Sequence, residues 1–294
     1  MLAYVVNLAI LICLNAILAT TLNFIMGYAG IFSIAHAIFF GVGAYTAAYL
    51  ATHATASFFV AIPAAMAVAG ALSLGLALPA LRVRGEYFVA ASLGLQVIGV
   101  TLFSEWKAVT GGIGGILGIP PLDVFGHPVI EPREFLALVI LCLGGIMAVT
   151  RRLVRGSFGR SLMAIRDSES AALAFGKNVS VIKTLSVVLS SSLAAVAGAL
   201  YSFYLSFINV ESFTLDTSVL LMAMVIIGGT GTLLGPIVGA ALLMILPSLL
   251  SYLWFLPQTE IGAVQQIIYG AAMMVLMIFR PGGIVGALQH KGRA

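Results

Sequence analysis

Charged side chains are scarce in this sequence. Its 294 residues include 14 basic and 10 acidic ones, together 8% of the chain, whereas 61% are hydrophobic. A soluble domain carries roughly 25% charged residues, so this chain cannot build a water-facing surface. The mean hydropathy of +1.14 leads to the same conclusion. The composition predicts a polytopic membrane protein and excludes a soluble enzyme or a nucleic-acid-binding protein.

Motifs that mark common catalytic and metal sites are also missing. The sequence contains no Gly-x4-Gly-Lys-Ser/Thr, no His-Glu-x-x-His, no Cys-x-x-Cys and no Gly-x-Ser-x-Gly. Without a phosphate-binding loop, the chain is not expected to hydrolyse ATP itself. Cys13 and Cys142 lie in apolar runs, where we expect small packing residues rather than a disulfide framework.

Long apolar runs fill most of the chain, and each helical span needs about 20 such residues. The runs lie at 4–25, 31–51, 58–80, 86–104, 135–150, 184–208, 217–228, 235–254 and 263–279. They predict an all-α fold, a single polytopic transmembrane helix bundle over 1–294 with about eight to ten spans. The run at 217–228 would reach only about 18 Å, which favours a half-helix or a re-entrant segment. Because Met1–Tyr4 lack Lys and Arg, the first run is expected to be a retained helix.

Basic residues are concentrated in a few connecting segments. All except Lys107 and Arg133 lie in 81–85, 151–183 and 280–294. The opposite side takes most of the acidic residues: Glu105, Asp123, Glu131, Glu134, Glu211, Asp216 and Glu260. Cytoplasmic loops carry the excess of Lys and Arg, so the three basic segments and the C-terminus are expected in the cytoplasm. If 4–51 forms two full spans, counting the spans back from a cytoplasmic C-terminus places the N-terminus outside.

The two longest connecting segments differ in character. Residues 105–134 are rich in Gly and Pro and are net acidic, which indicates an external loop. Residues 151–183 are the largest cytoplasmic element and contain a helical pattern. Its apolar residues, interrupted by Glu169, are Phe158, Leu162, Ile165, Ala172 and Phe175. This spacing predicts one short amphipathic helix, with Ser157 as its N-cap and Gly176 as its C-terminal stop.

Uncharged polar residues occur inside the apolar runs, whereas no Asp, Glu, Lys or Arg lies near the middle of one. The absence of intramembrane charge argues against a proton-driven carrier. The uncharged polar residues are Asn7, Asn15, Asn23, His36, Gln96 and the serines 190–192. His36, the asparagines and Gln96 each have two interpretations: a role in the substrate pathway, or a hydrogen bond that fixes a contact between helices. The second interpretation is favoured. The serine cluster has no acid or histidine nearby in sequence and is interpreted as helix packing.

Glycine interrupts the apolar runs near both ends of the chain, at 27–43 and 228–239. Interrupted helices in two halves of a chain are how many transporters build a substrate path. Small residues four positions apart also occur in pairs, which allow helix backbones to approach closely. These pairs are Ala37/Gly41, Ala194/Gly198 and Gly235/Gly239.

Several longer motifs, in order over about residues 20–286, resemble one known family. They are Gly27-Tyr28-Ala29-Gly30-Ile31-Phe32-Ser33-Ile34-Ala35-His36-Ala37, Leu81-Arg82-Val83-Arg84-Gly85-Glu86-Tyr87-Phe88, Ser157-Phe158-Gly159-Arg160-Ser161-Leu162-Met163-Ala164-Ile165-Arg166-Asp167, Gly228-Gly229-Thr230-Gly231-Thr232-Leu233-Leu234-Gly235-Pro236 and Phe279-Arg280-Pro281-Gly282-Gly283. Together they are similar to the permeases of branched-chain amino acid ABC importers, and to the M-type subunit among them. The resemblance implies a multi-pass protein of the bacterial inner membrane.

The resemblance also implies a division of labour. An external binding protein would deliver the substrate, a second homologous permease would share the pathway, and two ATP-binding subunits would supply the energy. This chain would need no cofactor or metal of its own, since ATP would be bound by its partners.

The helix at 157–178 would then be the coupling helix that docks in a groove of an ATPase. Such permeases carry Glu-Ala-Ala-x3-Gly there, and here Ser170 stands after the Glu. The implied coupling residues are Phe158, Arg160, Leu162, Ile165, Arg166, Glu169, Ala172 and Gly176. Of these, Phe158, Leu162 and Ile165 would be apolar anchors, with Arg166 and Glu169 as polar partners. The alternative is an amphipathic helix that lies on the inner leaflet.

The leading functional hypothesis is a transporter subunit for leucine, isoleucine and valine. The same machine with another small polar cargo, such as urea, an amide, another amino acid or a sugar, is the main alternative. An autonomous channel or secondary carrier and an intramembrane enzyme are the other classes, and neither a selectivity filter nor a clustered catalytic site supports them. Candidate pathway residues are Ser33, His36, Gly41 and Gln96.

Overall fold

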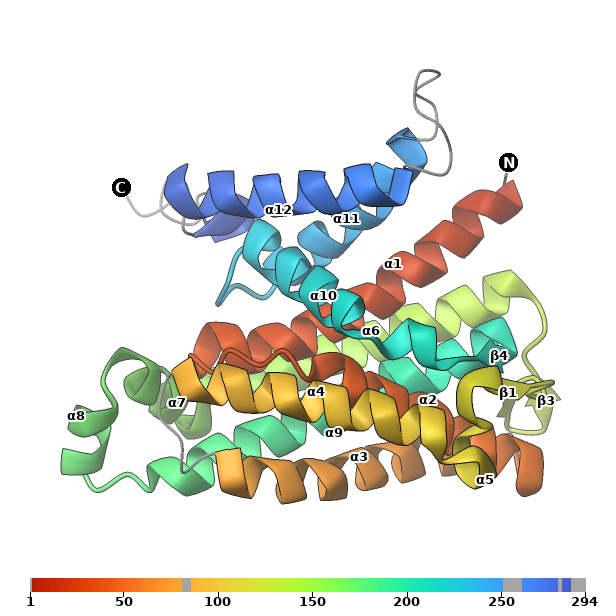
Figure 1. The fold of residues 1–294 in the computed structure, drawn as a ribbon, viewed down its shortest axis with the longest axis horizontal. Coiled ribbons are helices and arrows are strands. Elements are labelled where there is room, and N and C mark those ends of the chain that lie inside the picture. The colour runs from red at the N-terminus through yellow and green to blue at the C-terminus, as the bar shows by residue number, and fades with distance from the viewer. Residues whose placement is uncertain (1, 81–85, 251–260, 280–281, 287–294) are drawn as a thin grey trace.

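The computed structural model describes residues 2–80, 86–250, 261–279 and 282–286, and the part it describes is almost entirely helical. Its main helices are α1 (Leu2–Asn23), α2 (His36–His53), α3 (Phe58–Ala80), α4 (Glu86–Glu105), α5 (Lys107–Thr110), α6 (Pro132–Arg155), α7 (Ser157–Asp167), α8 (Glu169–Ala174), α9 (Val179–Leu205), α10 (Leu215–Gly228), α11 (Gly235–Leu250) and α12 (Ile261–Phe279). Each apolar run in the sequence overlaps one of these helices. The predicted all-α membrane fold is therefore confirmed (Figure 1).

Not every helix is long enough to cross a bilayer alone. Within the described residues, five helical stretches are long and apolar enough to do so. They are Ala3–Tyr28, Phe58–Gly75, Tyr87–Glu105, Pro132–Arg155 and Val179–Leu205. The helix α2 has 18 residues and is buried along most of its length. Shorter apolar helices occur at Leu215–Gly228, Gly235–Pro247 and Gln266–Val275.

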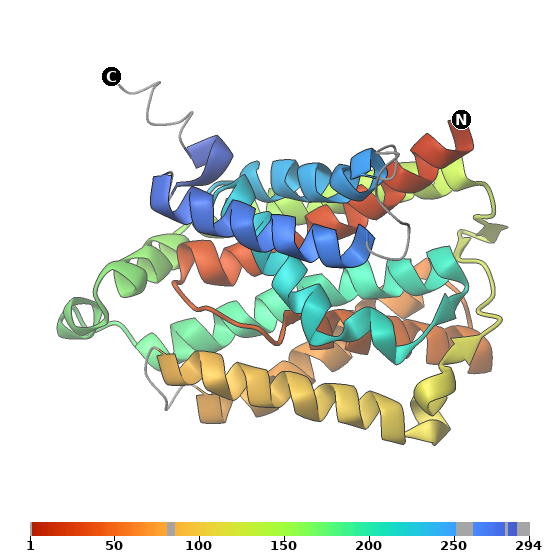
Figure 2. The same cartoon turned by 45° about the horizontal axis from the view of Figure 1, so that its top comes forward.

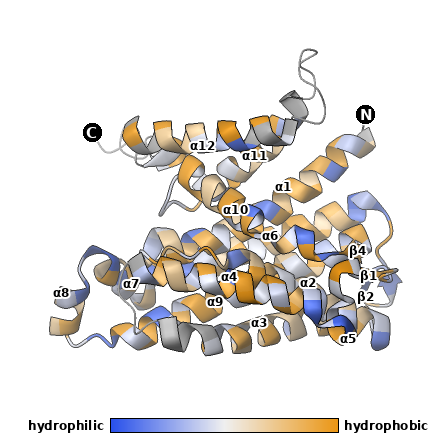
Figure 3. Ribbon diagram, viewed as in Figure 1, coloured by the Kyte–Doolittle hydropathy of each residue, from blue (hydrophilic) through white to orange (hydrophobic). Residues whose placement is uncertain are grey.

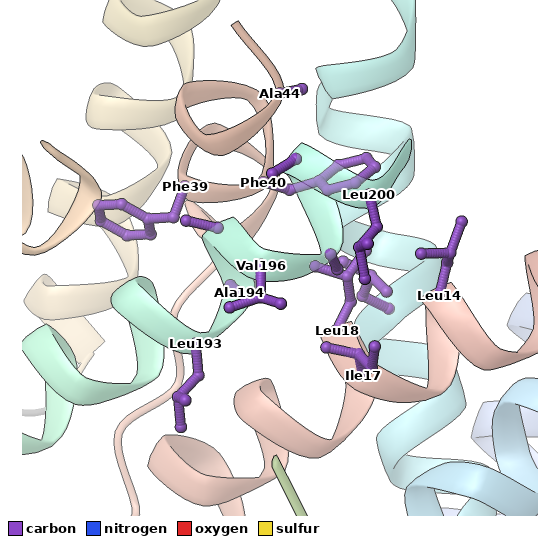
Figure 4. Close-up of a cluster of buried hydrophobic side chains, with 14 of the residues drawn as sticks. Leu14, Ile17, Leu18, Phe39, Phe40, Ala44, Leu193, Ala194, Val196 and Leu200 are labelled. Atoms are coloured by element: carbon purple, nitrogen blue, oxygen red, sulfur yellow. The ribbon is translucent and has the colours of Figure 1, made fainter. Parts of the chain in front are cut away.

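The core lies around α9, which packs against α1, α2 and α3. Figure 4 shows Leu14, Ile17 and Leu18 of α1 facing Val196 and Leu200 of α9, with Phe40 of α2 nearby. The contact between α2 and α9 is close because both helices present glycine. A Cβ on Gly43 would meet the backbone of Ala195, and one on Gly198 would meet the carbonyl of Phe40. The pair Ala194/Gly198 therefore packs helices as the sequence predicts.

Polar segments gather at the two ends of the bundle (Figures 1 and 3). One end holds α7 and α8, with the last turn of α6 and the first turn of α9. The other end holds the start of α1, α5 and the short strands β1 (Ile116–Leu117), β2 (Asp123–Val124), β3 (His127–Pro128) and β4 (Phe207–Ile208). The strands pair antiparallel, β1 with β4 and β2 with β3. The segments 105–134 and 151–183 thus lie at opposite ends, as their difference in charge predicts. Residues Arg82, Arg84, Glu260, Arg280, Lys291 and Arg293, which also entered the charge argument, lie outside the described residues.

The second apolar run is not one continuous helix. After α1 the chain forms a π-helix (Phe24–Tyr28), and α2 begins only at His36. Figure 2 shows the non-helical segment between them, in dark red, leading from the end of α1 to the start of α2. Gly30 supports this break because its φ is +69°, in the left-handed region that glycine adopts without strain.

The predicted amphipathic helix at 157–178 is in fact two helices. Ser168 is extended, which ends α7, and its hydroxyl accepts a hydrogen bond from the Ala171 N–H and so caps α8. The prediction of Ser157 as N-cap is also wrong, since Gly156 is the N-cap and Ser157 is the first helical residue. Gly156 is also the C-cap of α6, because its N–H donates to the carbonyls of Arg152 and Leu153. A glycine therefore joins the two helices directly, with no connecting loop.

Gly176 ends the second of these helices, as predicted. Its φ is +71°, and its N–H donates to the Leu173 carbonyl. The next N–H, of Lys177, donates to the Ala172 carbonyl. This pair of hydrogen bonds is the Schellman arrangement, in which a glycine takes the left-handed position after the helix.

Candidate functional site

A layer of uncharged polar groups lies around the start of α2, in the interior of the bundle. The His36 Nε2 lies 2.9 Å from the Thr21 hydroxyl of α1, and both side chains are buried. Thr21 in turn accepts, through its carbonyl, a 2.6 Å hydrogen bond from the Ser190 hydroxyl of α9. His36 and Ser190 therefore fix contacts among α1, α2 and α9, which is the helix-packing interpretation of both residues.

Gln96 on α4 extends this polar layer toward α10. Its amide nitrogen donates to the Phe213 carbonyl at 2.9 Å, and its amide oxygen accepts from the Ser218 hydroxyl at 3.3 Å. The Ser218 oxygen also accepts from the backbone N–H of Ala37, next to His36. One buried amide thus connects α4 with the first turns of α2 and α10. The sequence singled out Gln96 but offered no sign of its partners, because they lie more than a hundred residues away.

Ser33 lies in the non-helical segment before α2 and is buried. The following residue, Ile34, donates its backbone N–H to the Ser92 hydroxyl of α4 at 3.1 Å. Since Ser92 and Gln96 are one helical turn apart, the same face of α4 holds both the segment 29–35 and the start of α2. Among the described residues, the hydroxyl groups of Thr20 and Tyr45 are buried without a hydrogen-bond partner. Thr20, Thr21 and Ser218 belong to no motif in the sequence and were not predicted as site residues.

Aromatic side chains close the bundle between this layer and the end that carries the strands. They surround Phe213, whose ring lies 5.1 Å from that of Phe40, 5.5 Å from that of Tyr45 and 6.1 Å from that of Phe103. Gly41 faces this cluster, because a Cβ there would meet the rings of Phe103 and Phe213. The small residue at position 41 therefore makes room for aromatic rings, rather than for a second backbone.

The two interrupted segments meet on the other side of the polar layer. Asn23, at the end of α1, accepts a hydrogen bond from the Gly231 N–H at 2.9 Å and donates one to the Thr232 carbonyl at 2.7 Å. Both partners lie in the segment 229–234 between α10 and α11. The backbones approach so closely that a Cβ on Gly27 would meet the Gly231 nitrogen. We call this contact between the two interruptions the Asn23 junction.

Arg166 at the end of α7 lies against the same junction. Its guanidinium Nη1 donates to the Gly27 carbonyl at 2.8 Å, while Nε and Nη2 donate to one Asp167 oxygen. A Cβ on Gly30 would meet its aliphatic stem, and one on Gly231 would lie 3.7 Å from Nη1. A cation is favoured at the carboxyl end of a helix, where carbonyl groups lack intrahelical partners. Arg166 thus bonds the segment 151–183 to the first interruption and lies next to the second.

The remaining predicted coupling residues fall into a buried and an exposed group. Leu162 and Ile165 have exposed fractions of 0% and 4%, so they pack inside this chain, as does Ala172. Phe158 is half-buried and stacks on Phe24, with ring centroids 6.4 Å apart. Within the described chain, these apolar side chains anchor the segment to its own bundle.

The exposed coupling residues, Arg160 and Glu169, share their surface with two apolar side chains that were not predicted to take part in coupling. Phe175 is 86% exposed and Leu173 54% exposed, on and just after α8. Arg160 is exposed and donates to the Arg155 carbonyl at 3.2 Å. Glu169 pairs with Lys183 at 2.8 Å, which ties α8 to α9. Apolar and basic side chains are therefore available together on this surface.

The residues around these contacts do not form a metal centre. No group of three or more His, Cys, Asp or Glu side chains that could hold a metal ion occurs within the described ranges. The polar layer consists of hydroxyl, amide, imidazole and backbone groups. Such groups can accept and donate hydrogen bonds to a small polar molecule without holding a fixed charge in the membrane.

A multi-pass helix bundle with interrupted helices, an uncharged polar layer and a basic helical segment at one end defines a membrane permease. Residues 4–277 match the model of a family described as "Branched-chain amino acid transport system / permease component". The chain therefore belongs to this family. No solved structure matches the chain significantly.

Curated relatives agree with this assignment. The chain is 29% identical to the high-affinity branched-chain amino acid transport system permease protein LivM of Salmonella typhimurium, over 95% of this chain and 69% of the relative. The LivM protein of Escherichia coli is equally similar, with the same coverage. The autoinducer 2 import system permease protein LsrC of Klebsiella pneumoniae is 30% identical over 59% of this chain and 49% of its own length.

Proposed function

We propose that this chain is the membrane-spanning subunit of an ATP-driven importer that moves leucine, isoleucine and valine into the cytoplasm of a bacterium. An extracytoplasmic binding protein delivers the cargo, a second permease shares the pathway and two ATP-binding subunits supply the energy. Family membership supports the transport role. The observation that carries the coupling is the contact of Arg166 with Gly27, since it connects the basic cytoplasmic segment to the interrupted helices.

The arrangement of the interior supports a pathway that is closed on both sides in this conformation. The aromatic cluster around Phe213 closes the external side, and the Asn23 junction closes the cytoplasmic side. Between them lie His36, Gln96 and the unpartnered Thr20 hydroxyl. We infer that the polar ends of an amino acid exchange hydrogen bonds with this layer during passage. The orientation, with α7, α8 and the C-terminus in the cytoplasm, follows from the excess of Lys and Arg.

Transport then requires two alternating states. In one, the cytoplasmic side opens while the aromatic cluster stays closed. In the other, the aromatic cluster opens while the cytoplasmic side stays closed. Each closure is made of a few contacts that two elements share, so movement of one element can break it. An ATPase can drive this change only if its nucleotide state biases the position of α7 and α8. Arg166 provides the required mechanical connection because it bonds the carbonyl at the end of the α1 interruption.

The surface offered to the ATPase is α8 and the residues just after it. Leu162 and Ile165 are used inside the permease, so Leu173 and Phe175 are the apolar groups left for a partner's groove. The nearby Arg160 and Lys177 suit a groove with acidic residues on its rim. The competing proposal places the same surface on the inner leaflet, where apolar and basic side chains are also favourable.

The identity of the cargo is supported by the relatives and has one specific alternative. The two LivM proteins are named for branched-chain amino acids, whereas LsrC is named for autoinducer 2. The similarity to LsrC supports a second candidate, the same machine with a sugar-like or other small polar cargo. The uncharged polar layer suits either, because it contains no fixed charge that would select an amino acid.

Uptake of labelled leucine tests the cargo. Cells that lack the gene should lose high-affinity leucine uptake and regain it when the gene is restored, and excess valine and isoleucine should compete whereas urea and ribose should not. Normal leucine uptake in the deletion strain, without a second leucine importer, would contradict the branched-chain proposal. Competition by ribose alone would favour the sugar-like cargo.

Replacing Arg166 and Glu169 together with alanine tests the coupling. In the reconstituted complex, uptake per ATP hydrolysed should fall by about 5- to 150-fold, the range of typical coupling free energies. The matched control is the double change Arg133→Ala and Glu134→Ala, because these residues are an exposed arginine and glutamate at the start of α6, at the opposite end of the bundle. An unchanged ratio in the double variant would refute the role of this segment in coupling.

A further inference from the structure

A short hairpin at the end opposite to α7 and α8 carries an aromatic residue where its turn favours a small one. Val124 pairs with His127, so Phe125 and Gly126 alone make the turn between β2 and β3. Their φ angles are +55° and +82°. Two-residue turns with positive φ at both positions strongly prefer Asn-Gly or Gly-Gly. A phenylalanine in the left-handed region is a genuine outlier and marks a place where backbone strain is tolerated for a reason.

The hairpin is held firmly against the turn between α2 and α3. The backbone N–H of Asp123 donates to the Ala56 carbonyl at 3.0 Å, and Ser57 forms a bridge with Asp123. Val129 closes the base of the hairpin with a 2.8 Å hydrogen bond to the Leu122 carbonyl. The position of the Phe125 backbone is therefore imposed by its neighbours and is not a feature of a free loop.

The Phe125 side chain has one aromatic neighbour and is otherwise uncovered. Its ring centroid lies 4.6 Å from that of Phe59, which in turn packs on Phe58 at 5.4 Å. Phe125 is nevertheless 88% exposed and Phe59 is 50% exposed. The strain at residue 125 thus is not explained by burial inside this chain. A hydrophobic environment outside the chain would explain it.

The position of Phe59 shows which environment that is. Phe59 is the second residue of α3, and it begins a stripe of exposed apolar residues along that membrane-spanning helix. The stripe continues at helical spacing through Pro63, Ala67 and Ala71, with Val60, Val68 and Leu72 beside them. In a bilayer, an exposed apolar face of this kind on a spanning helix is suited to contact with lipid. The Phe125 ring extends the same face by one aromatic group beyond the end of the helix.

We propose that the hairpin 123–128 is a membrane-interface anchor, in which Phe125, stacked on Phe59, inserts at the boundary between headgroups and acyl chains. Tryptophan and tyrosine are enriched at that depth in membrane proteins, and phenylalanine is among the apolar residues that interfacial segments bury there. The competing occupant is the extracytoplasmic binding protein, which would also cover an exposed aromatic ring. Continuity with the lipid-facing stripe of α3 favours the bilayer. The proposal requires only that the chain spans a membrane and does not depend on its cargo or its energy source.

Fluorescence quenching in nanodiscs tests the position of the ring. A tryptophan-free background is made by W106F and W254F, since the chain has two tryptophans, and F125W is added to it. The matched control is I113W, which replaces an apolar residue of similar exposure, 80%, at the same end of the bundle. In phosphatidylcholine brominated on the upper part of its acyl chain, the F125W emission should be blue-shifted and should be quenched to a greater extent than the I113W emission. Equal or smaller quenching at position 125 would overturn the proposal. So would a blue shift that arises only on addition of the binding protein.

A second variant, Phe125→Asn, keeps the proposal testable if tryptophan disturbs the turn. Asn-Gly is a preferred pair for this hairpin, so the variant is expected to fold. Relief of the turn strain acts in both media, whereas loss of the anchor acts only at a bilayer. The change in unfolding temperature relative to the parent chain should therefore be less favourable in nanodiscs than in amphipol, which provides no bilayer interface. The same change in both media, or no change in either, would overturn the proposal.

Discussion

The side chain of Asn23 holds together two segments that lie far apart in the chain. In the sequence it is the last of three asparagines at eight-residue spacing on the first helix. In the structure, Asn15 only bonds the Leu11 carbonyl of its own helix, whereas Asn23 bonds two backbone groups more than two hundred residues away. A buried side-chain amide can satisfy one donor and one acceptor at once. Asn23 does so for the backbone of Gly231 and Thr232, where the chain has no regular structure of its own.

Replacing Asn23 with alanine should therefore destabilise the protein clearly more than the same change at Asn15. The variant leaves the Gly231 N–H and the Thr232 carbonyl without their partner, and an unsatisfied buried group costs about 1–3 kcal/mol. Asn15→Ala removes only a hydrogen bond within one helix, so we expect an effect within about 1 kcal/mol. Thermal unfolding of both variants in nanodiscs measures the difference. Equal unfolding temperatures for the two variants would mean that the Asn23 junction contributes nothing to stability.

At the scale of elements, glycines determine how closely the helices pack. Gly198 faces the backbone of α2, and Gly239 faces the Met224 carbonyl of α10, so both small residues bring two helices together. By contrast, Gly144 of α6 has nothing within 4 Å of the position a Cβ would take. Both kinds of glycine look alike in sequence. Only the structure separates glycines that a contact requires from glycines on an open face.

This difference predicts opposite outcomes for two glycine-to-alanine changes. Gly198→Ala forces α2 and α9 apart and should cost about 1–3 kcal/mol, as overpacking of a core does. Gly144→Ala adds a methyl group to an open helix face and should be neutral or stabilising by up to about 1 kcal/mol, because alanine has the higher helix propensity. The two variants can be compared by thermal unfolding in nanodiscs. A destabilised Gly144→Ala variant would indicate that an unseen partner covers that face.

Hydropathy predicted the helices well and glycine indicated the interruptions at 27–43 and 228–239, but nothing in the sequence indicated the break at Ser168. Each apolar run overlaps a helix because burial of apolar side chains requires only the average composition of a segment. The break before His36 and the break at Ser168 depend instead on single hydrogen bonds and on the left-handed Gly30. Leu162, Ile165 and Ala172 of the predicted apolar face at 157–178 are buried, whereas Phe175, which was assigned to the same face, is 86% exposed. Periodicity shows that Leu162 and Ile165 are buried and cannot show whether they pack against this chain or another.

At the scale of the whole molecule, charge is divided between the two ends of the bundle. The end with α7 and α8 carries five arginines and two lysines of the segment 151–183, with Asp167 and Glu169 as its acidic residues. The end with the strands carries most of the acidic side chains in the described chain. Because the division follows the long axis of the helices, it predicts the orientation in the membrane as well as the fold.

Accessibility of single cysteines in intact cells tests this orientation. The native thiols are first replaced by Cys13→Ala and Cys142→Ala, and one cysteine is then introduced at Ile113 or at Phe175. Both positions are highly exposed, at 80% and 86%, and they lie at opposite ends of the bundle, so equal accessibility to a reagent is expected unless the membrane intervenes. A membrane-impermeant maleimide should label Ile113→Cys in intact spheroplasts and Phe175→Cys only after permeabilisation. The reverse pattern would invert the topology and place α8 outside, where no ATPase could reach it, so one labelling experiment tests the orientation and the proposed coupling surface together.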